Sequence, residues 1–191
     1  MKNLIIVGSG GYAGVVIDAV LQSESHKIIG LVDDFLSEGQ IEKGFPILGG
    51  ISSLEKWRHE DIFFAIGNCR DRFEAWKRLN SYCPKFTTII HPRASVSASA
   101  MISSGVFVGA GASIGNNCQV GMMSIVNTNA TLCHDAILGE FSHLAPNSSV
   151  GGAAKVGNIC TVGMGGVIAD RVIVGSGITV EIGGKVVDNI H

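Results

Sequence analysis

Residues able to carry out acid–base chemistry gather in one segment of the chain, residues 127–143. This segment contains Asn127, His134, Asp135 and His143, and so holds two of the six histidines. A histidine titrates near neutral pH, and a neighbouring carboxylate can orient its ring and raise its basicity. The segment therefore predicts His134 as a general base with Asp135 as its partner. A solvated surface pair is the alternative interpretation.

Cys133 lies next to the predicted base and is a candidate nucleophile. Neighbouring side chains of a β-strand point to opposite faces, so we expect Cys133 to point away from His134. The same rule counts against a contact between His134 and Asp135. We therefore expect no covalent intermediate on Cys133.

The five cysteines are odd in number and form no Cys-x-x-Cys pair. This pattern indicates neither a zinc site nor a disulfide framework, so we expect no metal. Reduced and mostly buried thiols of a cytosolic protein are the better interpretation. The cysteines are Cys69, Cys83, Cys118, Cys133 and Cys160.

The candidate site lies within a repeat in which every sixth residue is aliphatic, from Ile90 to Val186. This period fits neither a helix nor a two-sided strand, but it suits a solenoid of short strands that each point one aliphatic residue inward. Three such strands would make a coil of about eighteen residues. Glycine often follows the aliphatic residue, as at Gly109 and Gly115, and there we expect corners that need backbone freedom.

The repeat predicts where the histidines lie and how copies of the chain associate. His134 comes two residues after the inward Leu132, so we expect it on the outside or at a corner. His143 follows nine residues later, half a coil away, and should lie on a different side of the solenoid. From Ile90 onward only nine residues are Asp, Glu, Lys or Arg, and bare apolar faces usually bind a partner. We expect a homo-oligomer in which these faces are covered by neighbouring copies.

Before the repeat, the chain has the pattern of a small phosphate-binding unit. A buried strand, Lys2–Val7, leads into Gly8-Ser9-Gly10-Gly11 and a helix, an order that aims backbone N–H groups at a phosphate. A second strand, Ile28–Val32, ends in Asp33-Asp34, where carboxylates accept hydrogen bonds from a ribose or a sugar. Close packing of strand on helix is the alternative reason for the glycines.

Only about one mononucleotide-binding half fits before the repeat, which is too little for a complete dinucleotide fold. The expected elements are helices at Ser52–Trp57 and Arg72–Leu79 and strands at Asp61–Ile66 and Phe86–Ile90. Gly67-Asn68 follows the strand Asp61–Ile66, at the edge where parallel sheets bind ligands. Arg70 and Arg72 are either phosphate ligands or part of a solvated helix start. His91-Pro92 marks the boundary between the two parts, because proline forces the preceding residue to be extended.

The overall composition argues against several partners. The formal net charge is -2 and the isoelectric point about 6.3, so no basic surface is expected and nucleic acid is not an expected partner. The apolar run Leu4–Val7 is too short for a signal segment or a membrane span. We expect a soluble, cytoplasmic protein without a membrane partner.

Together these motifs resemble the hexapeptide-repeat acyltransferases, and among them the bacterial nucleotide-sugar N-acetyltransferases that acetylate UDP-4-amino sugars. The resemblance implies an α/β half-Rossmann-like domain, residues 1–89, that binds the nucleotide sugar. A left-handed parallel β-helix, residues 90–191, would follow it and bind acetyl-CoA. We expect a homotrimer with active sites between subunits. The resemblance covers nearly the whole chain and rests on Gly8–Ala13, Asp33-Asp34, Gly67-Asn68, Asn127-Thr128, His134-Asp135 and Gly139–His143.

The resemblance also implies roles for single residues. His134 would deprotonate the sugar amine, Asp135 would raise the basicity of His134, and His143 would contact the acetyl end of acetyl-CoA. The residues expected to line the CoA groove are Gly152, Met164, Ile182 and Gly183. The residues expected to hold the nucleotide sugar are Gly10, Gly11, Tyr12, Asp33, Asp34, Gly67 and Asn68.

The chain departs from the family pattern in two places. Tyr12 stands where many members have His, and family chains usually continue past the last coil with a Gly-x-Pro-Ala-Lys tail, whereas this sequence stops at His191. We therefore expect altered contacts to the nucleotide and to the CoA tail. Two other functions stay open, a sialic acid O-acetyltransferase that uses the same base on a hydroxyl, and a non-catalytic nucleotide-binding solenoid. The motifs do not specify the sugar, the nucleotide base or the acyl chain.

Overall fold

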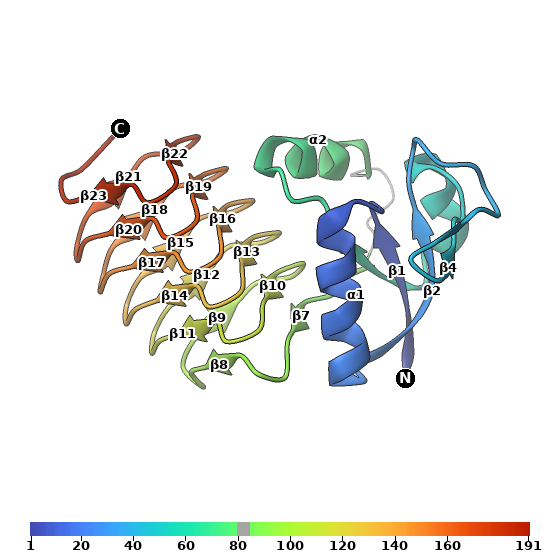
Figure 1. Cartoon of the computed structure of the whole chain (residues 1–191), viewed down its shortest axis with the longest axis horizontal. Coiled ribbons are helices and arrows are strands. Elements are labelled where there is room, and N and C mark those ends of the chain that lie inside the picture. Colours follow the sequence, from blue (N-terminus) through green and yellow to red (C-terminus); the bar gives the residue numbers. More distant parts are fainter. Residues whose placement is uncertain (80–84) are drawn as a thin grey trace. The chain divides into compact units, whose positions relative to one another are not determined.

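The structure, a computed structural model, describes residues 1–79 and 85–191. The chain divides into two compact units, Met1–Ile89 and Ile90–His191. Figure 1 shows an α/β unit followed by a stack of short strands coloured from green to red. The predicted fold class, an α/β domain followed by a parallel β-helix, is confirmed.

The N-terminal unit is built on a four-stranded parallel sheet in the order β2-β1-β5-β6. All four residues of β5 and the last four of β1 are buried, as expected for central strands of a parallel sheet. The strands are β1 (Lys2–Val7), β2 (His26–Val32), β5 (Asp61–Phe64) and β6 (Lys85–Phe86). The other elements are the helices α1 (Gly11–Ser23) and α2 (Cys69–Leu79), the 3-10 helix η1 (Ile51–Trp57) and the hairpin β3 (Ile41–Glu42) and β4 (Phe45–Pro46).

Element boundaries in this unit differ from the expected ones. The strand Asp61–Ile66 ends at Phe64. The helix after it begins at Cys69 rather than at Arg72, because Asn68 Oδ1 accepts hydrogen bonds from the backbone N–H groups of the next turn and caps the helix. The expected strand Phe86–Ile90 is interrupted, since β6 ends at Phe86 and β7 (Ile89–Ile90) belongs to a different sheet.

An ion-pair cluster lies where β5 begins. The Asp61 carboxylate is buried and accepts hydrogen bonds from His26 Nε2, at 3.1 Å, and from Lys85 Nζ. Burial alone would raise the pKa of Asp61, but the hydrogen bonds from Lys85 and His26 outweigh burial and hold this pKa below its ordinary value. The cluster joins the amino-terminal ends of the strands β2, β5 and β6.

The C-terminal unit is a parallel β-helix with three sheets of two-residue strands. Each strand pairs with the strand eighteen residues further along, as Thr131 does with Ser149. The first sheet contains β7 (Ile89–Ile90), β10 (Phe107–Val108), β13 (Ile125–Val126), β16 (His143–Leu144), β19 (Thr161–Val162) and β22 (Thr179–Val180). The second contains β8 (Ser95–Val96), β11 (Ser113–Ile114), β14 (Thr131–Leu132), β17 (Ser149–Val150), β20 (Val167–Ile168) and β23 (Lys185–Val186). The third contains β9 (Met101–Ile102), β12 (Gln119–Val120), β15 (Ile137–Leu138), β18 (Lys155–Val156) and β21 (Ile173–Val174).

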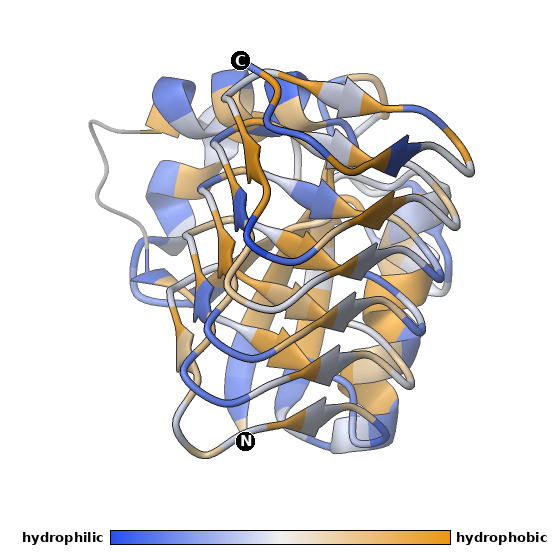
Figure 2. Cartoon of the chain, turned by 90° about the vertical axis from the view of Figure 1, so that its left-hand side faces the viewer, coloured by the Kyte–Doolittle hydropathy of each residue, from blue (hydrophilic) through white to orange (hydrophobic). Residues whose placement is uncertain are grey.

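The aliphatic residue of each hexapeptide forms the core of this unit. Every such residue from Val108 to Val180 is buried, and Figure 2 shows the hydrophobic colour following the stacked strands. Ile90, the first in the series, is 40% exposed. The end coil of a solenoid has a neighbour on one side only, so its inward residue is covered less than those between two coils.

The glycines that follow the aliphatic residues do not have the expected role. None of them adopts a positive φ, so they supply no special backbone freedom. Instead, the next coil approaches too closely for a side chain: a Cβ on Gly115 would lie 2.8 Å from the backbone nitrogen of His134. The left-handed conformation falls two residues later, on a glycine in some coils, as at Gly111 and Gly165, and on an ordinary residue in others, as at Phe141 and Ile159. The expectation of corner freedom at these glycines was therefore wrong.

Candidate active site

His134 and Asp135 form the corner turn that follows β14. His134 Nδ1 lies 2.8 Å from Asp135 Oδ2, although side chains of neighbouring strand residues would point apart. The contact exists because both residues lie in a turn and Asp135 has a left-handed backbone with φ of 59°. The side chains are 62% and 49% exposed, so the pair lies open at the corner.

The residues of the adjacent coils hold this pair in place. Asn117, eighteen residues before Asp135, donates from its Nδ2 to Asp135 Oδ1 at 3.1 Å. The hydrogen bond from His134, and then that from Asn117, holds the pKa of Asp135 below its ordinary value. An ionised carboxylate only accepts hydrogen bonds, so Nδ1 of His134 carries the proton and Nε2 is left as an acceptor.

Gly152 lies in the next coil at the same corner, eighteen residues after His134. A Cβ on Gly152 would lie 2.7 Å from His134 Nε2 and 2.8 Å from Cε1. The imidazole therefore rests against a position that has no side chain. Gly152 N–H is bound to Asp170 Oδ1 at 2.7 Å, which fixes this stretch of backbone.

His143 lies in β16, on a sheet rather than at a corner, and Asn127 of the preceding coil orients it. Asn127 Oδ1 accepts a hydrogen bond from the backbone N–H of Thr128, with 2.8 Å between oxygen and nitrogen. Its Nδ2 must then face His143 Nε2, which lies 3.1 Å away. His143 Nε2 accepts this hydrogen bond, so the proton of the neutral ring is carried by Nδ1.

The other residues expected at the CoA groove occupy two different corners. Met164 follows β19 and Ile182 follows β22, one coil apart at the same corner, where Gly183 N–H donates to Met164 O at 2.8 Å. Both side chains are large, apolar and at least half exposed. Gly152 follows β17 and shares the corner of His134 instead. Within one chain, Gly152 therefore lies beside His134, and Met164 lies beside Ile182. The two pairs lie at different corners of the β-helix.

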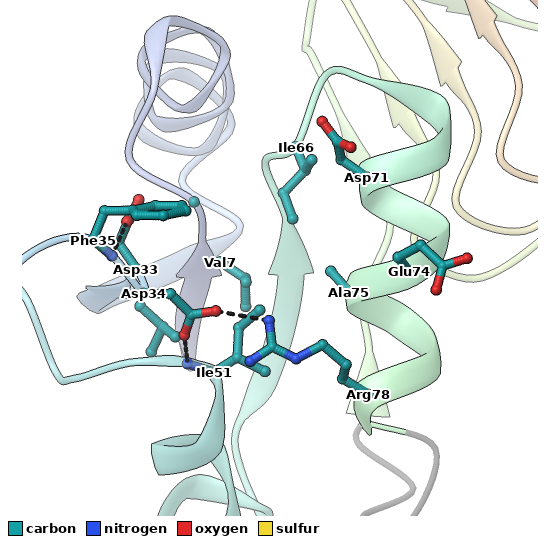
Figure 3. Close-up of a pocket in the computed structure, with 12 residues that line it drawn as sticks. Val7, Asp33, Asp34, Phe35, Ile51, Ile66, Asp71, Glu74, Ala75 and Arg78 are labelled. Carbon is teal, nitrogen blue, oxygen red and sulfur yellow. Dashed lines mark hydrogen bonds and ion pairs between the residues drawn. The ribbon is translucent and has the colours of Figure 1, made fainter.

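A pocket of about 460 Å³ lies at the carboxyl edge of the N-terminal sheet (Figure 3). Asp33 and Asp34, which follow β2, line it together with Gly8, which follows β1. Phe35, Arg78 and residues of α2 complete the wall. Its lining residues are Val7, Gly8, Val32, Asp33, Asp34, Phe35, Ile51, Ile66, Asp71, Glu74, Ala75 and Arg78.

The two aspartates of this pocket have different partners. Asp33 Oδ2 accepts hydrogen bonds from the Ser9 backbone N–H at 3.0 Å and from the Ser9 hydroxyl at 2.6 Å, and Oδ1 accepts from the N–H of Phe35. Asp33 thus fixes the glycine turn to the end of β2. Asp34 accepts from the N–H of Ile51 and from Arg78 Nη1, both at 2.7 Å. Burial alone would raise the pKa of Asp34, but the hydrogen bonds from Ile51 and Arg78 outweigh burial and hold this pKa below its ordinary value.

The glycine turn distinguishes packing glycines from open ones. Gly8 has φ of +98°, and a Cβ there would lie 3.0 Å from the carbonyl oxygen of Ala65. Close packing against the residue that follows β5 therefore requires a glycine at position 8. A Cβ on Gly10 or Gly11 would meet nothing within 4 Å. Close packing therefore explains Gly8 and not Gly10 or Gly11, which lie at the uncapped start of α1.

The remaining predicted substrate residues lie beside this turn. The Tyr12 hydroxyl is buried, and burial raises its pKa, an effect that the nearby Arg72 partly offsets. A Cβ on Gly67 would lie 3.9 Å from Tyr12 Cβ. Asn68 uses its side-chain oxygen to cap α2. None of these residues lines the pocket that contains Asp33 and Asp34.

Arg72 has a role that the sequence did not reveal. It is 1% exposed, so it is neither a solvated helix start nor an open phosphate ligand. Its Nη1 donates to the carbonyl oxygens of Ile66 and Gly67 at 2.7 and 3.0 Å. Arg72 therefore holds the loop between β5 and α2 in place.

Two structural features were looked for in the described part of the chain, a cluster of metal ligands and a membrane-spanning helix. Within residues 1–79 and 85–191, no group of three or more His, Cys, Asp and Glu side chains is arranged to hold a metal ion. No helix in the same ranges is long and apolar enough to cross a membrane. Cys69, Cys118 and Cys160 are buried and Cys133 is half-buried, whereas Cys83 lies outside the described residues.

The fold and site define a hexapeptide-repeat protein with a pocket in its α/β unit and a histidine–carboxylate pair on its β-helix. Residues 3–79 match the family model of the PglD N-terminal domain. The chain is 31% identical over 111 residues to UDP-N-acetylbacillosamine N-acetyltransferase of Bacillus subtilis. The matched segment is 56% of this chain and 51%, about half, of the length of that relative.

Two acetyltransferases are among the solved structures that resemble the whole chain. A histidine-to-asparagine mutant of perosamine N-acetyltransferase from Caulobacter crescentus, in complex with CoA and GDP-perosamine, gives a TM-score of 0.94 and 30% identity over 100% of this chain and 90% of its own. The acetyltransferase domain of PglB from Neisseria gonorrhoeae gives a TM-score of 0.91 and 31% identity over 100% and 94%. The chain belongs to the nucleotide-sugar N-acetyltransferase family of the hexapeptide-repeat acyltransferases. The predicted family is thereby confirmed.

Proposed function

We propose that the chain transfers an acetyl group from acetyl-CoA to the amine of a nucleotide-linked 4-amino sugar, with His134 as the general base. The observation that carries this proposal is the 2.8 Å contact of His134 Nδ1 with Asp135 Oδ2, because it leaves Nε2 as a proton acceptor at an open corner. The Caulobacter relative bound to CoA and GDP-perosamine supports the same two classes of substrate.

The proposed reaction is a direct transfer. The amine nitrogen attacks the thioester carbonyl while His134 Nε2 accepts the amine proton. An N–C bond forms, the C–S bond breaks as the tetrahedral adduct collapses, and the departing CoA sulfur takes the proton from the imidazolium. His143 or a backbone N–H stabilises the oxyanion of the adduct. No protein group is acylated, so Cys133 has no role in the chemistry.

The two units divide the binding work in this proposal. The N-terminal unit holds the nucleotide sugar, with Gly10 and Gly11 at the start of α1 offering backbone N–H groups to phosphate. Asp34 contacts the ligand directly, whereas Asp33, Tyr12, Gly67 and Asn68 shape the surrounding loops. The β-helix binds acetyl-CoA, with His143 at its acetyl end. The groove for CoA runs between two β-helices, with Gly152 on one copy of the chain and Met164, Ile182 and Gly183 on its neighbour.

The active site would form between copies of the chain in a homotrimer. His134 lies at the corner after the second sheet, and His143 lies on the first sheet, so one chain does not bring them to one acetyl group. Exposed apolar residues of the β-helix, including Met101 at 59% and Ile182 at 71%, support burial against a neighbouring copy.

A thiol-release assay tests the proposed function. The protein is mixed with acetyl-CoA and a panel of nucleotide 4-amino sugars, nucleotide 4-hydroxy sugars and free sialic acids. We expect thiol release and an N-acetylated product with the amino sugars, and intersecting initial-velocity lines that indicate a ternary complex. Transfer only to sialic acid hydroxyls would favour the O-acetyltransferase alternative. A burst of acetyl-enzyme would contradict direct transfer.

A further inference from the structure

The carboxylate of Asp135 is held from two sides. Oδ2 lies 2.8 Å from His134 Nδ1, and Oδ1 accepts a hydrogen bond from Asn117 Nδ2 at 3.1 Å. The backbone of Asp135 is fixed separately, because its N–H donates to the carbonyl oxygen of Asn116 at 2.9 Å. With one partner on each oxygen, the carboxylate cannot turn about its bond to Cβ without breaking a hydrogen bond.

The exposure of Asp135 makes the contact with Asn117 important. The Asp135 side chain is 49% exposed, so water competes for any carboxylate oxygen that has no protein partner. The torsion that turns a carboxylate has broad minima, so it is not fixed by its own rotamer preference. Without the amide of Asn117 the carboxylate can therefore rotate, and His134 Nδ1 can exchange Asp135 for water.

Asn117 is itself held by the coil before it. Its backbone N–H donates to Ser99 Oγ at 3.0 Å, and Ser99, Asn117 and Asp135 follow one another at intervals of eighteen residues. Asn117 has a left-handed backbone with φ of 57°, which asparagine adopts more readily than most residues. A purely structural role in this turn is therefore the alternative explanation for an asparagine here.

We propose that Asn117 is a positioning residue for acetyl transfer. By holding Asp135, Asn117 keeps the proton of the neutral His134 ring on Nδ1, and Nε2 stays able to accept the proton of the amine. A neutral imidazole without a fixed partner can carry its proton on either nitrogen, and a ring protonated on Nε2 cannot accept a proton there. Asn117 acts through Asp135 and not through a contact to the acetyl group. This inference rests on the proposed function, because it concerns the base of that reaction.

The tautomer of His134 tests the inference without any substrate. Nitrogen–proton correlation spectra of the whole protein, labelled at the histidine nitrogens, distinguish the two tautomers at about pH 9, where imidazoles are neutral. The signals that disappear in His134→Ala identify this ring. We expect the Nδ1–H form in the unaltered protein and a mixture of both forms in Asn117→Gly. Glycine accepts the left-handed backbone, so this variant removes the amide and keeps the turn.

The rate of transfer supplies the second readout. Asn117→Gly should lower kcat by about tenfold, because a misoriented base is less effective, whereas complete removal of the base should cost at least about 100-fold. The KM for acetyl-CoA should change by less than about twofold, since Asn117 has no part in binding it.

Asn129→Gly is the matched control. Asn129 has the same left-handed turn conformation, with φ of 55°, but the residue eighteen positions later is Asn147 and not a carboxylate. We expect Asn129→Gly to change the free energy of unfolding as Asn117→Gly does, to within about 0.5 kcal/mol, and to keep the kcat and the Nδ1–H tautomer of the unaltered protein.

Four results would each overturn the inference. These are an Nε2–H ring at His134 in the unaltered protein, an unchanged Nδ1–H form in Asn117→Gly, an unchanged kcat in Asn117→Gly, and an equal loss of kcat in Asn129→Gly. Failure of the unaltered protein to transfer acetyl groups would instead refute the proposed function, and the spectra would still decide whether Asn117 sets the tautomer of His134.

Discussion

Replacing Gly152 by alanine should separate catalysis from stability at the proposed base. The new Cβ would lie 2.7 Å from His134 Nε2 and 2.8 Å from Cε1. Ordinary contact begins near 3.4 Å, so the ring must move by about 0.7 Å. Gly152 does not have a positive φ, so the alanine backbone is unstrained. The three closest atoms all belong to the His134 ring, and this side chain is 62% exposed, so the ring can yield toward solvent without moving the backbone.

The expected loss is therefore catalytic. Displacement of a catalytic group by about 1 Å can cost about 100-fold in rate, which corresponds to about 2.7 kcal/mol of transition-state stabilisation. We expect Gly152→Ala to lower kcat by about 10- to 100-fold. The free energy of unfolding should change by less than about 1 kcal/mol. Thiol release at saturating acetyl-CoA measures the first quantity, and urea denaturation the second.

A double-mutant cycle with His134→Ala supplies the control. Once the imidazole is removed, the alanine methyl at position 152 has nothing to displace, so His134→Ala and the double variant should have the same residual kcat. Wild-type kcat in Gly152→Ala would refute the reasoning. A further loss in the double variant would show that Gly152 acts through another group, such as bound CoA.

Three further predictions concern stability and assembly. Gly14→Ala should raise the free energy of unfolding by about 0.5–1 kcal/mol, because the position is within α1 and an added Cβ has only ordinary contacts, and denaturation measures this gain. Asp61→Asn should cost about 2 kcal/mol at pH 7. The folded pKa of Asp61 is depressed, so this contribution is present above the unfolded pKa of about 3.9 and is lost as pH falls through the lower folded value. Urea titrations of both proteins at several pH values should therefore converge in acid, and a constant difference would contradict the ion-pair explanation. Mixing inactive His134→Ala and His143→Ala chains should restore activity in mixed trimers, and no recovery would place the site within one chain.

The sequence revealed the β-helix because each hexapeptide has one position that faces the core. A shift of the strand register by one residue would turn an aliphatic side chain from the core to the surface. Aliphatic residues such as Leu132 and Val150 therefore recur at every sixth position, and the sequence shows this period. It did not reveal the corner conformation. Phe141 and Ile159 have positive φ because backbone N–H groups bond to the preceding coil, at 2.9 and 2.8 Å, and not because these residue types favour it.

The candidate site was predictable by residue type and less so by geometry. His134 and Asp135 were chosen as a pair, but strand geometry argued against their contact, and only the left-handed turn at Asp135 explains it. The burial of Arg72 depends on three-dimensional packing, which a charged residue at a helix start does not signal. The contact of Gly152 with His134 joins residues eighteen positions apart, so the repeat length could have suggested it.

The central claim is that His134 acts as the base for acetylation of a nucleotide amino sugar. The most direct test is the single-turnover rate of acetyl transfer from acetyl-CoA to UDP- and GDP-linked 4-amino sugars, with the product identified by mass spectrometry. We expect an N-acetylated nucleotide sugar, and a rate at least about 100-fold lower in His134→Ala while acetyl-CoA still binds. An undiminished rate in His134→Ala, or no transfer to any nucleotide amino sugar, would contradict the claim.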